Sequence, residues 1–307
     1  MASMREIKSR LSSVRSSQKI TGARRMIASA RLKQTELSLR NALPYEKALQ
    51  AMLNHLNTYD FDVNSTLTVE RQMKKMVLVV VGSDEGMNGA YNTNVLRFVR
   101  EAVGKIPAGV MLEVIYTGKK LASQLRKLSN ITLSEAPAEF HEKQYAEGVN
   151  LLAKQLTDRF QKAEIDRVDV VYTHYKSRGT QIVTQTQLLP LSKTALKEFS
   201  AKSEENDSQN FDKSNQDDKD DLLYYFYEPS GEEIVAKLYP LIVRTKFYKF
   251  VLESRTSEEA MRIIAMQTAN DNADKLTEQL QLQYNKLRQQ NITNELLDLV
   301  EGQTERD

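Results

Sequence analysis

The sequence predicts an α/β domain combined with a long antiparallel coiled coil formed by the N- and C-terminal helices. Two observations predict this fold. Glycine and proline, the strongest interrupters of regular structure, are concentrated in the middle of the chain, with only one of each before Gly82 and one of each after Gly231. Apolar residues repeat at helical spacing near both ends and form short strand-like runs between them. We therefore expect an N-terminal helix at 1–57, an α/β domain at 74–195, an acidic insert at 196–222 and a C-terminal helix at 230–302.

The N-terminal arm begins with a capping box, in which the Ser3 hydroxyl accepts the Glu6 backbone N–H and Glu6 reaches back. Apolar residues then follow at the 3-4-3 spacing of a coiled-coil seam. They are Met4, Ile7, Leu11 and Val14, after which the seam is expected to shift to Ile20, Ala23, Ile27, Ala30 and Leu37. We expect the helix to run to about Leu56, with Pro44 as a kink or break.

The C-terminal arm has a similar start at Ser230 and Glu233, and a second possible start at Thr256. Pro240 is expected to kink the first part. One apolar stripe follows: Ala269, Ala273, Leu276, Leu280, Tyr284 and Leu287. Each arm has a single narrow stripe, so the two helices should pair with each other, and antiparallel, because they come from opposite ends of one chain.

The middle of the chain alternates strands with helices, which is typical of a parallel, Rossmann-like α/β sheet. Strands are expected at Met76–Val81, Val110–Tyr116, Val168–Tyr175 and Gln181–Leu189, the last two meeting around Gly179. Helices are expected at Ala90–Val103, Leu121–Leu128 and Lys143–Ala163. The segment Glu198–Asp221, with nine acids and three lysines, is too polar to bury a core and is interpreted as a solvated loop.

Composition narrows the function classes. The chain has no cysteine, so it has neither a disulfide framework nor a thiolate nucleophile. No stretch of about 18 apolar residues predicts a membrane span, and the first residues lack the pattern of a signal peptide. The absence of a transit-like extension before Ser3 favours a bacterial source, and we expect the protein at the cytoplasmic face of the inner membrane as a peripheral subunit.

The sequence carries few signals of catalysis, and no cofactor or metal is expected. The turn Gly82–Gly89 lies between a strand and a helix, where an anion could bind, but its spacing is not that of a dinucleotide site. Asp84 and Glu85 are interpreted as ordinary polar turn residues rather than as a metal site. The histidines His55, His141 and His174 have no metal-ligand spacing.

The first 33 residues carry a strong positive bias, nine basic residues against the single acid Glu6. The basic residues are Arg5, Lys8, Arg10, Arg15, Lys19, Arg24, Arg25, Arg31 and Lys33. Such a bias indicates an anionic partner. Nucleic acid, a membrane surface and an acidic protein are the candidates. A protein is preferred, because no aromatic residue precedes Tyr45 and bulky apolar anchors are lacking.

Both arms resemble the gamma subunit of F-type ATP synthase. The N-terminal motifs are Arg5-Glu-Ile-Lys-Ser-Arg-Leu-Ser-Ser-Val14, Gln18-Lys-Ile-Thr21 and Met26-Ile-Ala-Ser-Ala30. The C-terminal motifs are Ser257-Glu-Glu-Ala-Met-Arg262, Ala269-Asn-Asp-Asn-Ala273 and Tyr284-Asn-Lys286. In the middle, Gly82-Ser-Asp-Glu-Gly86 is similar to the family's strand-end turn. The resemblance follows the chain in order over nearly its whole length.

The resemblance implies a non-catalytic rotor shaft, present once per complex, which couples ion-driven rotation of a membrane c-subunit ring to ATP synthesis. Its partners would be the alpha and beta subunits of the catalytic hexamer, the epsilon subunit and that ring, with no nucleic acid. A coiled-coil adaptor with another acidic partner is the alternative, since it would share the two arms.

Family positions carry over to a few residues. The resemblance implies hexamer contacts at Arg24, Arg25, Arg262, Gln289 and Thr293, and contacts with the rotor ring or epsilon at Tyr225, Tyr227 and Glu228. For the tyrosines, ordinary strand packing is the alternative. The sequence departs from the family at Gly22 and Arg24, where a helix former and an apolar residue are usual. The acidic insert lies where chloroplast members carry two cysteines, so thiol regulation does not carry over.

Overall fold

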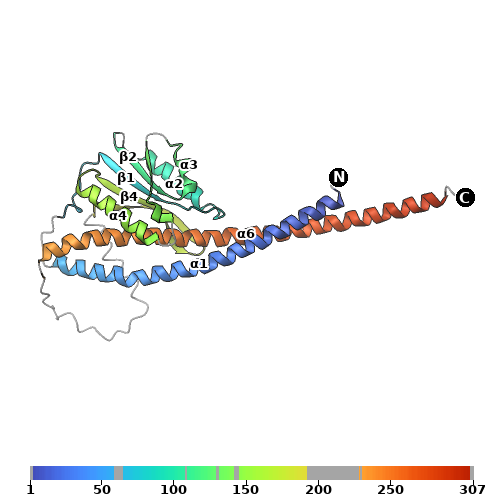
Figure 1. Cartoon of the computed structure of the whole chain (residues 1–307), viewed down its shortest axis with the longest axis horizontal. Coiled ribbons are helices and arrows are strands. Elements are labelled where there is room, and N and C mark those ends of the chain that lie inside the picture. Colours follow the sequence, from blue (N-terminus) through green and yellow to red (C-terminus); the bar gives the residue numbers. More distant parts are fainter. Residues whose placement is uncertain are drawn as a thin grey trace, which may run out of the picture. The chain divides into compact units, whose positions relative to one another are not determined.

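The computed structural model describes residues 3–58, 65–107, 109–128, 131–141, 145–191, 228 and 230–304. The chain forms two compact units, and both terminal helices contribute to both. Unit 1 comprises Met1–Leu32, Met87–Gly89 and Glu259–Asp307, and unit 2 comprises Lys33–Gly86 and Ala90–Glu258. The predicted fold class is confirmed: the long N- and C-terminal helices pack together, and the middle of the chain forms a mixed five-stranded α/β sheet (Figure 1).

Helix α1 extends over Met4–Thr58 without interruption. The Glu6 backbone N–H donates to the Ser3 hydroxyl at 3.2 Å, as the capping box predicts. The reciprocal half of the box is wrong, because the Glu6 carboxylate accepts instead from Arg10 at 2.7 Å. Pro44 does not break α1, and its exposed position lets the helix continue past the missing backbone donor.

Helix α6 extends over Gly231–Thr304, and its first turn is capped by a bond of 3.3 Å from the Glu233 N–H to the Ser230 hydroxyl. The second helix start expected at Thr256 is wrong. Its buried hydroxyl donates to the Leu252 carbonyl at 2.8 Å, one turn earlier in the same helix. Threonine satisfies its hydroxyl this way inside a helix, so a cap-like sequence at this point does not require a cap.

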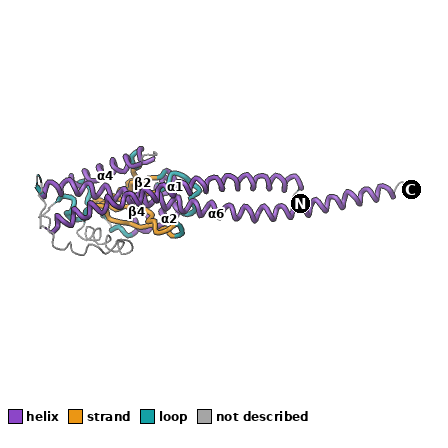
Figure 2. Tube along the Cα trace, turned by 90° about the horizontal axis from the view of Figure 1, so that it is seen from below, coloured by secondary structure: helices purple, strands orange, loops and turns teal. Residues whose placement is uncertain are grey.

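In unit 1, α1 and α6 lie side by side as an antiparallel pair (Figures 1 and 2). The seam of α1 does not shift as expected from the sequence. It continues at strict heptad spacing through partly or fully buried residues: Met4, Ile7, Leu11, Val14, Gln18, Thr21, Arg25, Ala28 and Leu32. The facing seam of α6 is Ile263, Met266, Asn270, Ala273, Thr277, Leu280, Tyr284 and Leu287. Leu276, assigned to the stripe from the sequence, is 44% exposed.

Unit 2 contains the sheet, in the strand order β3-β2-β1-β4-β5. The strands are β1 (Lys75–Val81), β2 (Met111–Thr117), β3 (Thr132–Glu135), β4 (Arg167–Ser177) and β5 (Thr180–Leu189). The helices between them are α2 (Tyr91–Gly104), α3 (Lys119–Leu125), the 3-10 turn η1 (Ala138–His141) and α4 (Tyr145–Gln161). The sheet is parallel except that β5 pairs antiparallel to β4, and these are the two strands that the sequence predicts on either side of Gly179.

One hydrophobic core holds unit 2 together. Alternate residues of β1, namely Val77, Val79 and Val81, belong to the same buried cluster as side chains of α4, β4 and the first half of α6. The rings of Tyr172 on β4 and Phe250 on α6 stack with centroids 4.4 Å apart. The first part of α6 is therefore a core element of the sheet's own unit.

Candidate functional site

A run of polar residues interrupts the apolar seam of the helical pair in unit 1. Three side-chain pairs join the helices there, and we call their six residues the polar seam: Gln18 with Asp274, Thr21 with Asn270, and Arg25 with Gln267. The pairing descends α1 as it ascends α6, as an antiparallel arrangement requires. The first of these pairs is exposed and the other two are part-buried. Polar pairs at a coiled-coil seam cost stability and favour one register, because any slip leaves donors and acceptors unmatched.

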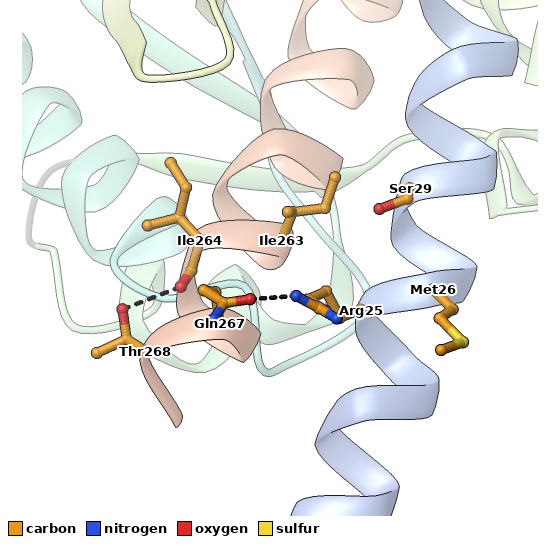
Figure 3. A pocket seen from close by; sticks show the side chains of 7 residues that line it. All are labelled: Arg25, Met26, Ser29, Ile263, Ile264, Gln267 and Thr268. Atoms are coloured by element: carbon orange, nitrogen blue, oxygen red, sulfur yellow. Dashed lines mark hydrogen bonds between the residues drawn. The ribbon is translucent and has the colours of Figure 1, made fainter. Parts of the chain in front are cut away.

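A groove of about 510 Å³ opens beside the last of these pairs. It is lined by Arg25, Met26 and Ser29 of α1 and by Ile263, Ile264, Gln267 and Thr268 of α6. Figure 3 shows the Arg25 guanidinium directed at the Gln267 side chain, while Met26 points away from that contact. The Thr268 hydroxyl donates back to the Ile264 carbonyl at 3.0 Å. The groove therefore offers mainly apolar walls beside one cation.

The face of α1 opposite its seam is also apolar. On this face, Ile20 and Ile27 are 57% and 54% exposed. The sequence pattern places both residues in the seam, and the structure places them outside it. Most of the basic residues of this arm are likewise exposed, with Arg24 and Arg25 half-buried. A surface that combines exposed isoleucine with a high positive charge is typical of a binding surface rather than of a free helix.

Arg262 lies in a charged cluster within unit 1. Its side chain is 3% exposed and contacts the Glu259 carboxylate at 2.6 Å. Arg31 of α1 lies 3.6 Å from the other oxygen of that carboxylate. Glu259 is thus placed between two guanidinium groups, and its carboxylate compensates the charge of the buried Arg262.

The remaining predicted contact residues lie elsewhere. Gln289 and Thr293 are exposed on the last part of α6, and the Thr293 hydroxyl donates to the Gln289 carbonyl at 3.0 Å. At 1.5 Å per residue, Gln289 is about 33 Å along the helix from Gln267. Figure 1 shows that α6 continues past the beginning of α1 in this region. The helical pair of unit 1 therefore offers two separate levels of candidate contact, one at the groove near Arg25 and one at Gln289 and Thr293 near the end of α6.

Of the three residues predicted to contact the rotor ring or epsilon, the structure describes only Glu228. Glu228 is exposed and, in unit 2, lines a groove of about 290 Å³ with Ile234, Lys237, Leu238 and Leu241. Tyr225, Tyr227 and the insert at 196–222 lie outside the described residues.

The polar turn after β1 has structural contacts. The Asp84 carboxylate accepts the Lys119 backbone N–H at 3.0 Å, which links the turn to the start of α3.

His174 Nδ1 lies 2.5 Å from the Glu253 carboxylate. Within the described part of the chain, no three His, Cys, Asp or Glu side chains are grouped to hold a metal, and no helix is long and apolar enough to cross a bilayer.

Comparison with known proteins agrees with this geometry. A family model described as ATP synthase matches residues 3–304. The chain is 36% identical to an ATP synthase gamma chain of Bacteroides thetaiotaomicron over 304 residues, which cover 98% of this chain and 99% of the relative. It is 35% identical to the gamma chain of Flavobacterium psychrophilum over 307 residues, with 98% of both chains covered.

Solved structures share the fold at lower identity. A chain of the Euglena gracilis mitochondrial ATP synthase in rotational state 3 aligns with a TM-score of 0.61 and 21% identity, over 98% of this chain and 93% of that chain. A chain of the Tetrahymena thermophila mitochondrial central stalk and c-ring aligns with a TM-score of 0.56 and 21% identity, over 81% and 99%.

The chain belongs to the ATP synthase family. Within that family it is a gamma subunit, the central-stalk rotor of the F-type ATP synthase. The sequence resemblance is thereby confirmed. The apolar pattern of the sequence does not predict the polar seam. Its signal is nevertheless present, because Val14, Gln18, Thr21, Arg25 and Ala28 keep the heptad spacing if polar residues are admitted to it.

Proposed function

We propose that the chain acts as a non-catalytic shaft, one copy per complex, at the cytoplasmic face of a bacterial inner membrane. The helical pair of unit 1 turns inside a ring of alpha and beta subunits, and the α/β domain together with the segment around Glu228 contacts epsilon and the membrane c-ring. Ion flow turns the ring and shaft, and the surrounding subunits make ATP.

The observation that carries this proposal is the outward face of the helical pair in unit 1. Exposed apolar side chains such as Ile20 and Ile27 cost free energy in water, about 25 cal/mol for each Å² left uncovered. The basic residues on the same arm favour an acidic lining around it. A sleeve that is apolar in places and acidic in others would satisfy both features.

The proposed hexamer contacts lie at two levels. At the first, Arg25 lines the groove of unit 1 and Arg24 is its half-buried neighbour in sequence. Arg262 is buried against Glu259, so it would act through that carboxylate rather than by its own exposed surface. At the second, Gln289 and Thr293 present free helix surface. An asymmetric shaft contacts each of three catalytic subunits differently, so their conformations must differ, and turning the shaft exchanges them.

Native mass spectrometry of the tagged chain, extracted gently from its own detergent-solubilised membranes, tests the assembly. The expected species has one copy of this chain with a three-plus-three hexamer, a small epsilon-like subunit and the membrane ring. Recovery as a free monomer, or with nucleic acid, would overturn the proposal.

A pair of variants tests the surface itself. Ile20→Asp with Ile27→Asp puts two charges on the outward face without touching the seam, and should abolish hexamer binding while the circular dichroism stays unchanged. Ile20→Val with Ile27→Val, the matched control, keeps the face apolar and should assemble normally. Normal assembly of the aspartate variant would show that another surface binds the hexamer.

A further inference from the structure

The sheet of unit 2 has a topological switch point. From β1 the chain proceeds to β2 and β3 on one side and then returns to β4 on the other. In doubly wound sheets the carboxyl ends of the two strands at such a point leave a crevice, and ligands bind there. In this chain the corresponding edge, between the ends of β1 and β4, is occupied by residues 254–258 of α6.

Two serines of α6 replace a missing strand at this edge. The ladder between β1 and β4 ends at the pair Val80 and Val171, but β4 continues to Ser177. Beyond the ladder, the Thr173 N–H donates to the Ser254 hydroxyl at 3.0 Å, and the Ser257 hydroxyl donates to the Thr173 carbonyl at 3.0 Å. The backbone groups of Thr173 are thus satisfied by side chains, as buried backbone groups must be.

Two further contacts complete the arrangement. The Tyr91 hydroxyl, at the start of α2, donates to Ser254 at 3.1 Å, and the Ser83 hydroxyl after β1 donates to the Glu258 carboxylate at 2.5 Å. Burial raises the pKa of Tyr91, so its hydroxyl remains a neutral donor. We call these six residues the switch-point socket: Ser83, Tyr91 and Thr173 from the sheet side, and Ser254, Ser257 and Glu258 from α6.

The socket differs in kind from the rest of the interface. Phe247, Phe250 and Val251 of α6 are buried in the apolar core of the unit, and apolar contacts hold surfaces together with little directional preference. Hydrogen bonds weaken steeply when their angle or distance changes. Rotation of α6 about its axis would therefore break the socket bonds before it separated the apolar surfaces.

We propose that the switch-point socket is the joint through which torque passes from the α/β domain to α6, and that Ser254 and Ser257 are the positioning residues of this joint. The proposal rests on the rotor function proposed above. In this fold the crevice that other doubly wound domains use for a ligand holds a helix of the same chain. A ligand could enter only by displacing α6.

The test uses the assembled complex in inverted membrane vesicles. Ser254→Ala with Ser257→Ala removes both bonds to Thr173 and leaves the apolar core intact. ATP hydrolysis should persist, while the ratio of ATP-driven membrane potential to hydrolysis falls about twofold or more, because a loosened joint slips under load. The Thr173 amide should exchange hydrogen about tenfold faster, since it loses its partner.

Thr256→Val is the matched control. Thr256 is as buried as the two serines, but its hydroxyl bonds only within α6. This variant should keep both the transport ratio and the exchange rate of the Thr173 amide. Should the double alanine variant fail to assemble, Tyr91→Phe removes one donor at nearly constant shape, and it should lower the ratio by a smaller factor.

The outcomes separate the two proposals. A wild-type chain that does not assemble with the hexamer and ring refutes the rotor function. If the wild-type complex couples normally, and the socket variants keep the wild-type ratio although their Thr173 amide exchanges faster, the role of the socket in passing torque is refuted while the rotor function stands. A wild-type ratio in Tyr91→Phe, where that variant is the one measured, refutes it as well.

Discussion

A part-buried ion pair joins α1 to α6 in unit 2, and removal of one or the other partner should have unequal effects on stability. The Lys249 ammonium donates to both oxygens of Glu46 at 2.8 and 2.9 Å. The Glu46 side chain is 11% exposed and that of Lys249 is 32% exposed. Water can therefore reach the cation if its partner is lost, but reaches the anion poorly. Lys249→Met should be the more damaging change.

The magnitude follows from these exposures. Leaving one member of a fully buried pair uncompensated costs about 3–5 kcal/mol. In Lys249→Met the member left behind is Glu46, and because this pair is open to solvent at its cation end, the cost should be about 2 kcal/mol. Glu46→Leu loses the same bonds but buries an apolar side chain, which contributes about 1.5–3 kcal/mol. The net change should be near zero, and the double variant should be at least as stable as the wild type.

Urea denaturation of the full chain, followed by circular dichroism, measures these differences. With a slope of about 2–3 kcal/mol per M, Lys249→Met should lower the midpoint by about 0.7–1 M. The double variant should restore it. A larger destabilisation by Glu46→Leu than by Lys249→Met, or a double variant that is the least stable of the three, would contradict this assignment of the unpaired charge.

Three other perturbations follow from the contacts described. Tyr175→Phe removes the hydroxyl whose bond of 2.7 Å is the main cause of the lowered pKa of Glu36. The wild type should therefore resist unfolding better than Tyr175→Phe at pH values above 4.5, the ordinary pKa of a glutamate, and this difference in stability should be lost as pH falls through the lowered pKa of Glu36. Urea midpoints measured from acid to neutral pH test this. Gly118→Ala should destabilise more than Gly109→Ala in thermal melts, because both have φ near +95° but only at Gly118 would the new methyl lie 2.7 Å from backbone atoms. Leucine at Gln18, Thr21, Arg25 and Asn270, the polar-seam residues that occupy heptad seam positions, should raise the melting temperature yet permit register slips, detectable by cross-linking between introduced cysteines.

The sequence predicted the elements whose signal is local and continuous. The apolar run of β1 and the helical spacing of both arms are such signals, and the helices follow them. It failed where a polar residue occupies a core position. Gln18 and Thr21 look like surface residues, so the apolar Ile20 was assigned to the seam in their place. The partners that make these positions polar are more than 240 residues away along the chain.

Two other misses have similar causes. Strand β3, Thr132–Glu135, has four residues and no apolar run, and it is defined only by its parallel pairing with β2. The socket at Thr173 was also invisible, because serines in a helix usually face water or their own backbone. The role of Ser254 and Ser257 depends on which strand edge the helix contacts, and the tertiary structure, not the local sequence, determines that contact.

The distance in sequence between the two halves of the helical pair also affects how the chain is made. Gln18 and Asp274 are separated by 256 positions, so the N-terminal arm cannot find its partner until nearly the whole chain has been translated. At about 5–20 residues per second, that wait is roughly 13–50 s. During it, the apolar seam of the nascent N-terminal arm has no C-terminal helix to pack against. Such long-range closure slows folding, and the ribosome-bound chain is the state in which this protein most needs a chaperone.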